Sequence, residues 1–285
     1  IESVDTPVST RQWRCVAKTH HELLVDPMSV AGLDSWPPKY QGGKWGRYLR
    51  APDIYWHMLE QHQTHLVALG QVADVTLGSM TLQNEFFHVR VHAPWPARTR
   101  VVVCTNAVGH RFEMESCFLV PLLKDPKICD CTVAAPDSIT LWLFRCPLER
   151  RDLSGTAALR YINWGEKAPA VVKQGSRKGE QVVGYHNLPA LRGRSRWWDI
   201  GSVPTPSIIM PKGTGDTHKH CVVPFQCTAD QRFYCVTARD RVCLLPVFNS
   251  TVYLLFKEAE GRVALGGGAL DMSTRDVRRL RVPDP

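Results

Sequence analysis

The chain is a succession of short apolar segments separated by turns, and no apolar run approaches the roughly 20 residues of a membrane span. Phe87, Val89 and Val91 alternate with polar residues, which predicts a half-buried strand. The other predicted strands cover residues 100–105, 139–144, 208–210, 221–225 and 232–237. Helices are predicted over 149–163, after the capping pair Asn249-Ser250, and after a capping box that opens at Ser273. We therefore expect an α+β fold, in which helices pack on a mixed or antiparallel β-sheet.

Residues 1–43 differ in composition from the rest of the chain. They contain His20-His21, a short apolar run, and a proline- and glycine-rich stretch from Trp36 to Gly43. Such a pattern is typical of the end of one domain followed by a connector. We expect 1–43 to be this tail and 44–285 to form the main domain. Because the chain begins with Ile1 rather than Met, we also expect it to belong to a longer protein.

The charge of the chain is compatible with a polyanionic partner. Its 35 Lys and Arg residues exceed its 27 Asp and Glu residues, which gives a net charge of +8 and a pI near 9.0. Many basic proteins bind no polyanion, so charge alone identifies no ligand. Without a leader peptide or a membrane-length apolar run, the expected location is the cytoplasm.

The ten cysteines contain no Cys-x-x-Cys pair, and several lie in apolar runs. Reduced thiols are therefore the simplest interpretation. The best metal candidate is the group His218, His220, Cys221 and Cys227, and whether it binds metal stays open.

The segment 44–87 carries the most specific chemistry. It begins with three cationic side chains among aromatic residues, and these are candidate DNA contacts: Lys44, Arg47 and Arg50. A helix is predicted next, since Pro52 suits a first helical position and Asp53 favours the positive end of the helix dipole. A strand, a polar loop over 78–84 and a second strand through 85–87 are then predicted.

The loop 78–84 has side chains suited to reading a base. Gly78 allows a sharp reversal, and the amides of Gln83 and Asn84 can bond an adenine edge bidentately. Thr81, in the same loop, is also a candidate DNA contact. For Asn84 the alternative is a turn residue whose side chain bonds nearby backbone.

In their order, these residues resemble the start of the target-recognition region of adenine-specific DNA methyltransferases from restriction–modification systems, the single-chain enzymes of type IIG or IIS. Matching positions are Lys44, Trp45, Tyr48, Leu49, Arg50, Pro52, Gly78, Asn84, Glu85, Phe86 and Phe87. Leu82 stands where the family often has a second glycine. The resemblance recurs, in the same order, at residues 109–124, 158–166, 195–199, 230–234, 249–251, 267–271 and 282–285.

The resemblance implies that 44–285 is a DNA target-recognition domain and that 1–43 is the tail of a methyltransferase domain. The implied partners are double-stranded DNA and the parent protein's own N-terminal methyltransferase domain. The implied cofactor of the parent protein is S-adenosylmethionine, with Mg²⁺ if that protein also carries a nuclease. We expect no cofactor in this chain.

A second cationic segment covers residues 173–199. Its candidate DNA contacts are Lys173, Arg177, Lys178, Arg192, Arg194 and Arg196. Guanidinium groups can neutralise phosphates and pair with guanine, and the interspersed glycines predict loops. The alternative is a solvated loop without a ligand. Trp197 and Trp198, in the same segment, are expected in the core.

Motifs for catalysis are missing from the sequence. It has neither a methyl-donor glycine loop nor the Asn/Asp-Pro-Pro-Tyr/Phe motif of adenine methylation. Asp125-Pro126-Lys127 has the spacing of a nuclease motif, but its proline predicts a loop. We expect no catalytic residue here. Two other functions remain open: a stand-alone DNA specificity or adaptor protein, and a general RNA- or polyanion-binding module.

We predict that this chain alone binds no S-adenosylmethionine, because no residue set for the cofactor is present in the sequence. Isothermal titration calorimetry of the purified chain with S-adenosylmethionine should give only heats of dilution. A saturable site of micromolar affinity would contradict the prediction.

Overall fold

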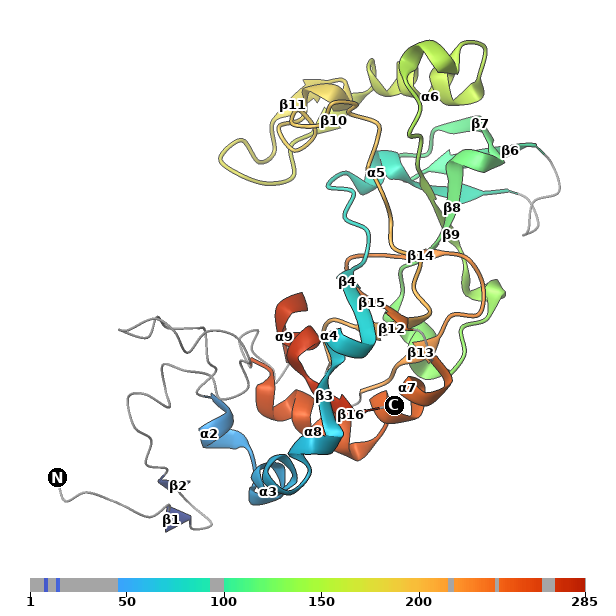
Figure 1. Cartoon of the computed structure of the whole chain (residues 1–285). Helices are drawn as coiled ribbons and strands as arrows, with labels where there is room; N and C mark the ends of the chain where they lie inside the picture. Colours follow the sequence, from blue (N-terminus) through green and yellow to red (C-terminus); the bar gives the residue numbers. More distant parts are fainter. Residues whose placement is uncertain are drawn as a thin grey trace. The chain divides into compact units, whose positions relative to one another are not determined.

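A computed structural model describes residues 8–9, 14–15, 46–92, 100–214, 218–238, 241–262 and 270–284. The chain divides into two compact units, whose elements are labelled in Figure 1. Unit 1 comprises Ile1–Val72, Gly213–Asp216 and Pro246–Pro285, and unit 2 comprises Ala73–Lys212 and Thr217–Leu245. The expected domain boundary at residue 43 and the candidate Lys44 lie outside the described residues.

Unit 1 is mainly helical. Its helices are α2 (Gly46–Arg50), α3 (Asp53–Gln61), α4 (Leu69–Val72), α8 (Thr251–Glu260) and α9 (Thr274–Arg279), and α7 (Arg241–Phe248) enters it from unit 2. Its strands pair antiparallel as β1 (Val8–Ser9) with β2 (Arg14–Cys15) and as β3 (Leu66–Ala68) with β16 (Arg281–Pro283). Both predicted serine caps are present: Ser250 accepts from Tyr253 N, and Ser273 forms a capping box with Asp276.

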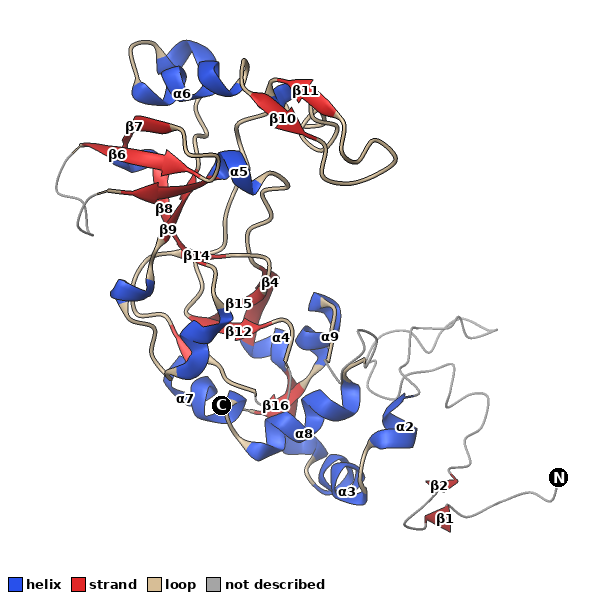
Figure 2. Ribbon diagram, turned by 180° about the vertical axis from the view of Figure 1, so that it is seen from behind, coloured by secondary structure: helices blue, strands red, loops and turns tan. Residues whose placement is uncertain are grey.

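The two larger sheets of unit 2 are among the strands drawn in red in Figure 2. The six-stranded sheet has the order β14-β8-β9-β5-β6-β7, antiparallel except at the β14–β8 edge. Its strands are β5 (His88–Val91), β6 (Val101–Asn106), β7 (Arg111–Glu115), β8 (Leu119–Leu123), β9 (Leu141–Phe144) and β14 (Thr228–Ala229). The antiparallel four-stranded sheet has the order β13-β12-β15-β4, formed by β4 (Ala73–Leu77), β12 (Ile208–Pro211), β13 (Cys221–Val222) and β15 (Phe233–Ala238).

Helices and short turns complete unit 2. A separate hairpin consists of β10 (Pro169–Val171) and β11 (Gln181–Val183). The described helices that lie wholly within unit 2 are α5 (Asn84–Phe87) and α6 (Ala157–Gly165). Among the described residues of the chain, 3₁₀ turns lie at Gln63–His65, Ser116–Phe118, Pro126–Asp130, Pro136–Ser138, Arg150–Leu153 and Tyr185–Asn187. The mixed and antiparallel sheets with packed helices confirm the predicted α+β class.

The core of unit 2 is centred on an aromatic pair. Phe86 of α5 is fully buried and stacks on Tyr161 of α6, with 4.6 Å between the ring centroids. The Tyr161 hydroxyl donates to the Phe86 carbonyl oxygen at 2.7 Å. At the start of α6, the Glu115 carboxylate accepts from the backbone N–H groups of Ala157 and Ala158 at 2.6 and 3.0 Å. These contacts fix α5, and with it the end of the 78–84 loop.

Two predicted elements differ in the structure. Residues 85–87 form a helical turn rather than a strand, because Phe86 and Phe87 are both buried and a strand would direct them to opposite faces. The predicted helix over 149–163 is interrupted at Gly155, which has φ +79°. Helix α6 then begins after Thr156, whose hydroxyl accepts from Leu159 N at 3.1 Å.

Gly78 has a different role from the sharp reversal that the sequence predicts. The structure shows no positive φ at this residue. A Cβ atom placed there would lie 2.1 Å from the Asp230 carbonyl oxygen and 2.7 Å from that of Ala229. Gly78 N–H donates to the Phe233 carbonyl oxygen at 2.9 Å, and Ser79 N–H donates to that of Ala229 at 2.6 Å. Glycine is therefore required because two backbone segments approach closely.

We predict that Gly78→Ala destabilises the protein by at least ~2 kcal/mol, because the rigid backbone of residues 229–230 cannot move away from the added carbon. Gly193→Ala is the matched control, since a Cβ at Gly193 meets nothing within 4 Å. Urea unfolding followed by tryptophan fluorescence measures both variants. Equal stability of the two variants would contradict this role for Gly78.

Candidate nucleic-acid interface

The loop between β4 and α5 is held in one conformation by its own side chains. Thr81 is buried, and its hydroxyl donates to Asn84 Oδ1. Gln83 is also buried, and its Nε2 donates to Glu85 Oε2 at 3.0 Å. Leu82 has φ +62°, a left-handed conformation that costs a residue other than glycine ~1–2 kcal/mol. Leu82 thus adopts a backbone conformation that favours glycine.

This loop and two other segments of the chain line a pocket of about 480 Å³. The loop supplies Met80, Leu82, Gln83, Asn84 and Glu85, the β10–β11 hairpin supplies Lys173 and Gln174, and the β14–β15 turn supplies Gln231. A smaller pocket of about 40 Å³ adjoins it and shares Leu82, Gln83, Lys173 and Gln174. We call the larger one the amide pocket, because four of its eight lining side chains carry a carboxamide.

The chemistry of the amide pocket is mostly neutral. Lys173 Nζ lies 2.6 Å from Glu85 Oε1, so the cation and the carboxylate largely offset each other. Met80 and Leu82 are 49% and 44% exposed and present apolar surface. The Asn84 amide Nδ2 is not engaged by any residue that the structure describes. The pocket therefore offers amide donors and acceptors beside apolar side chains.

Arg194 contacts the loop through its guanidinium group. Its Nη2 donates to the Thr81 carbonyl oxygen at 2.9 Å, and its guanidinium carbon lies 5.4 Å from the centroid of the Phe87 ring. Half-burial lowers the pKa of Arg194 below its ordinary value. These contacts give Arg194 a structural role, whether or not it also meets a phosphate.

The other cations of the second segment are distributed over its surface. Arg177 pairs with Glu180 in the exposed β10–β11 loop, where Lys178 is also exposed. Arg196 pairs with Glu149 and with Asp199, the latter at 2.7 Å. Arg192 is exposed and makes no ion pair with a described residue. Trp197 and Trp198 are 8% and 7% exposed, which confirms their predicted place in the core.

The two described cations of the first segment lie in unit 1. Arg47 is 3% exposed and pairs with Glu260 at 3.2 Å, so its guanidinium is engaged within unit 1. The Glu260 carboxylate also accepts from the Tyr55 hydroxyl, at 2.5 Å. Arg50 donates to the carbonyl oxygens of Ala259 and Gly261 at the end of α8. In this fold both arginines join α2 to α8.

The four candidate metal ligands, His218, His220, Cys221 and Cys227, all lie among the described residues. Among the described residues, no group of three or more His, Cys, Asp or Glu side chains is arranged to hold a metal ion. Cys221 lies in the core, with its Sγ 3.8 Å from Cys129 Sγ. Asp125 accepts from Lys127 N at 3.0 Å and caps a 3₁₀ turn, which supports the prediction of a loop there.

Sequence reasoning missed three residues of the amide pocket. Gln174 lies within the second cationic segment but carries no charge itself. Gln231 lies in the block 230–234, which carries the family resemblance, and Met80 lies within the predicted loop. No pattern in the sequence indicates that residues 83, 174 and 231 meet.

Comparison with known proteins identifies the family. The family model described as "Type II methyltransferase M.Eco57I, C-terminal domain" matches residues 140–285. The chain belongs to this family. The matched region includes Lys173, Gln174 and Gln231, whereas the 78–84 loop precedes it.

Among solved structures, the type IIG restriction endonuclease BpuSI is similar, with 12% sequence identity and a TM-score of 0.49. The match covers 85% of this chain and 26% of that one. No curated protein matches the sequence. In the part of the chain that the structure describes, no helix has both the length and the apolar character needed to cross a membrane.

We predict that Arg194→Ala destabilises the protein by about 1–2 kcal/mol, because it removes a charged hydrogen bond to the loop backbone and a contact with Phe87. Arg192→Ala is the control, since Arg192 is exposed. In urea unfolding the Arg192 variant should keep the wild-type midpoint. Identical midpoints for both variants would show that Arg194 does not stabilise the loop.

Proposed function

We propose that unit 2 binds duplex DNA sequence-specifically, as the target-recognition part of an adenine-specific DNA methyltransferase of a restriction–modification system. The proposal is supported by the family to which the chain belongs. The observation that carries it is the amide pocket, where Gln83, Asn84, Gln174 and Gln231 converge from three segments. Carboxamides pair bidentately with the N6 and N7 edge of adenine in the major groove.

The surroundings of the pocket fit a duplex. Exposed Met80 and Leu82 can contact the methyl group of thymine or the face of a displaced base. The adjoining hairpin carries Arg177 and Lys178, both exposed, where backbone phosphates would pass. Their charges supply affinity that falls with salt, whereas the neutral pocket supplies discrimination between bases.

The chemistry of methylation belongs, in this proposal, to the methyltransferase domain of the parent protein, which would bind S-adenosylmethionine. Mg²⁺ would be needed only if the parent protein also cleaves DNA. The recognition domain docks the duplex in register, so that the target adenine can be extruded toward the catalytic domain. With this assignment we also propose the cytoplasm of a bacterium or archaeon as the location of the protein.

We predict that Gln174→Ala and Gln231→Ala each lower affinity for the preferred duplex by ~1–3 kcal/mol while binding to random duplex stays nearly unchanged. Both side chains are exposed, so neither substitution should affect folding. The preferred duplex is first obtained by selection from a randomised library with the whole chain. Fluorescence anisotropy at fixed salt then measures both affinities.

Gln181→Ala is the matched control, because Gln181 is an exposed glutamine of the same hairpin that does not line the pocket. It should leave both affinities unchanged. Failure of the selection to enrich any sequence would reject base-specific recognition. Equal competition by structured RNA and duplex DNA would support a general polyanion-binding module instead.

A further inference from the structure

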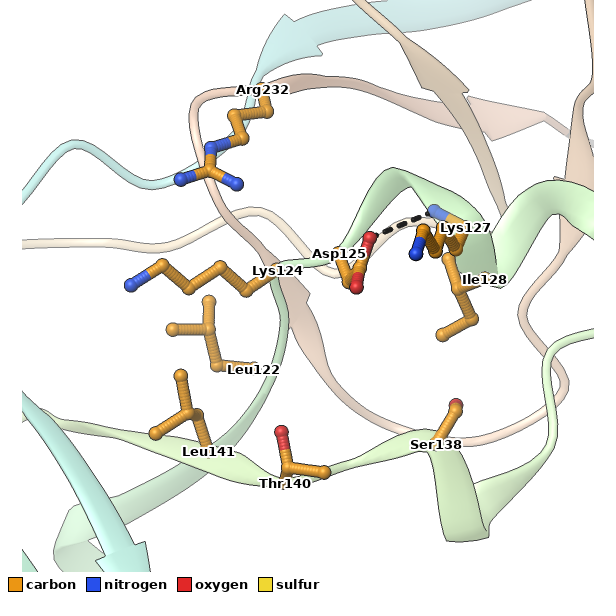
Figure 3. Close-up of a pocket in the computed structure, with 9 residues that line it drawn as sticks. All are labelled: Leu122, Lys124, Asp125, Lys127, Ile128, Ser138, Thr140, Leu141 and Arg232. Carbon is orange, nitrogen blue, oxygen red and sulfur yellow. Dashed lines mark hydrogen bonds between the residues drawn. The ribbon is translucent and has the colours of Figure 1, made fainter.

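A second pocket of unit 2, of about 540 Å³, is distinct in chemistry from the amide pocket (Figure 3). It is lined by three cations, Lys124, Lys127 and Arg232, and by a single carboxylate, Asp125. The hydroxyls of Ser138 and Thr140 add hydrogen-bonding groups, and Leu122, Ile128 and Leu141 form the apolar floor. We call it the basic pocket. Its volume lies within the range of ligand-binding sites.

The cations of the basic pocket are only partly neutralised. Asp125 is engaged as the cap of a turn, where it accepts from Lys127 N. Asp230 is buried behind Arg232, with 3.7 Å between its Oδ1 and Arg232 Nε. No described residue bonds Lys127 Nζ or the two Nη atoms of Arg232. An oxyanion in the pocket would therefore find donors that the protein itself does not use.

The imidazole of His88 contacts one of these cations. Lys124 Nζ lies 3.2 Å from His88 Nδ1, an arrangement that requires neutral imidazole as the acceptor. Burial, together with the charges of Lys124 and then Arg232, lowers the pKa of His88 to about 4. The neutral ring orients Lys124, and Figure 3 shows Lys124 and Arg232 extending to the same side of the pocket.

One turn of the chain connects the two pockets. Gln231 lines the amide pocket and the next residue, Arg232, lines the basic pocket. Successive Cα atoms lie 3.8 Å apart, so the two side chains start from neighbouring points of one turn. The buried Asp230 carboxylate accepts from Arg232 N at 3.1 Å and holds this turn rigid. A base edge and a nearby backbone phosphate can thus be bound together.

We propose that the basic pocket binds one backbone phosphate of the duplex whose bases meet the amide pocket, with Lys124 and Arg232 as the principal contacts. This inference rests on the proposed function. It also gives a physical role to two blocks of the family resemblance, 109–124 and 230–234, which contain none of the candidate DNA contacts of the hairpin. The bound phosphate fixes the register in which the amides meet the bases.

The test compares neighbouring residues in the whole chain. Arg232→Gln and Lys124→Met should weaken binding to preferred and random duplexes alike, by about five-fold at 0.15 M salt. Each should lower the slope of log affinity against log salt by about one. Gln231→Ala, one residue away, should instead reduce only sequence preference. Arg160→Gln is the charge-matched control, because Arg160 is 63% exposed and pairs with Glu113 outside both pockets.

A second measurement uses the wild-type protein and inorganic phosphate. Phosphate in the basic pocket should raise the pKa of His88, because the anion offsets the charges of Lys124 and Arg232. Nitrogen-15 NMR of the imidazole should show this shift, and the Lys124→Met/Arg232→Gln double variant should show no response to phosphate. This readout does not depend on the single variants remaining folded.

The outcomes separate the two proposals. Normal duplex binding with unchanged salt slopes in both variants overturns the phosphate contact, even if the proposed function holds. A His88 response to free phosphate without those slope changes assigns the pocket to small anions and rejects the duplex backbone as its ligand. Absence of any duplex binding by the wild type rejects the proposed function and this inference together, and a His88 response would then leave only a free-phosphate site.

Discussion

The close approach of two backbone segments at Gly78 determines where the candidate site lies. Gly78 and Ser79 bond the backbone of Phe233 and Ala229, and the Ser79 hydroxyl lies 2.9 Å from that of Thr228. The space between the segments is too small for a Cβ. The loop that carries Gln83 is therefore attached to the turn that carries Gln231 and Arg232. The amide pocket depends on this contact, because it takes residues from both the loop and the β14–β15 turn, and the same turn supplies Arg232 to the basic pocket.

Aromatic packing provides the rigid support on which this contact depends. Phe86 packs on Tyr161 and on Trp197, whose centroid lies 4.8 Å away, so α5, α6 and the second cationic segment share one core. Trp197 Nε1 donates to Glu166 at 3.1 Å, and Arg150 pairs with the same carboxylate at 2.6 Å. The hydrogen bond from Arg150 is the main cause of the lowered pKa of Glu166. Loops anchored in this way can hold side chains in a fixed geometry toward a ligand.

Local signals in the sequence predicted local structure well. The caps at Ser250 and Ser273, the strand near residues 101–106 and the burial of Trp197 all follow from short patterns, and all are present. The family resemblance, and with it the expectation of DNA targeting, also came from ordered short motifs. The pockets could not be predicted, because Gln231 meets Gln83 only through tertiary folding. Similarly, nothing local distinguishes Arg47, buried against Glu260, from an exposed arginine.

Not all of the cations behind the net charge of +8 are equally available to a phosphate, because some already form ion pairs within the protein. Arg177, Arg196 and Lys173 all have carboxylate partners within the protein, so a phosphate would have to displace an existing neighbour. Such exposed pairs contribute little stability, and displacing them costs correspondingly little. Cations with incomplete pairing, such as those of the basic pocket, gain more from each phosphate because they give up no comparable contact. Under the proposed function, affinity for a duplex should therefore depend on a few such cations, while the neutral amides beside them would decide which sequence is preferred.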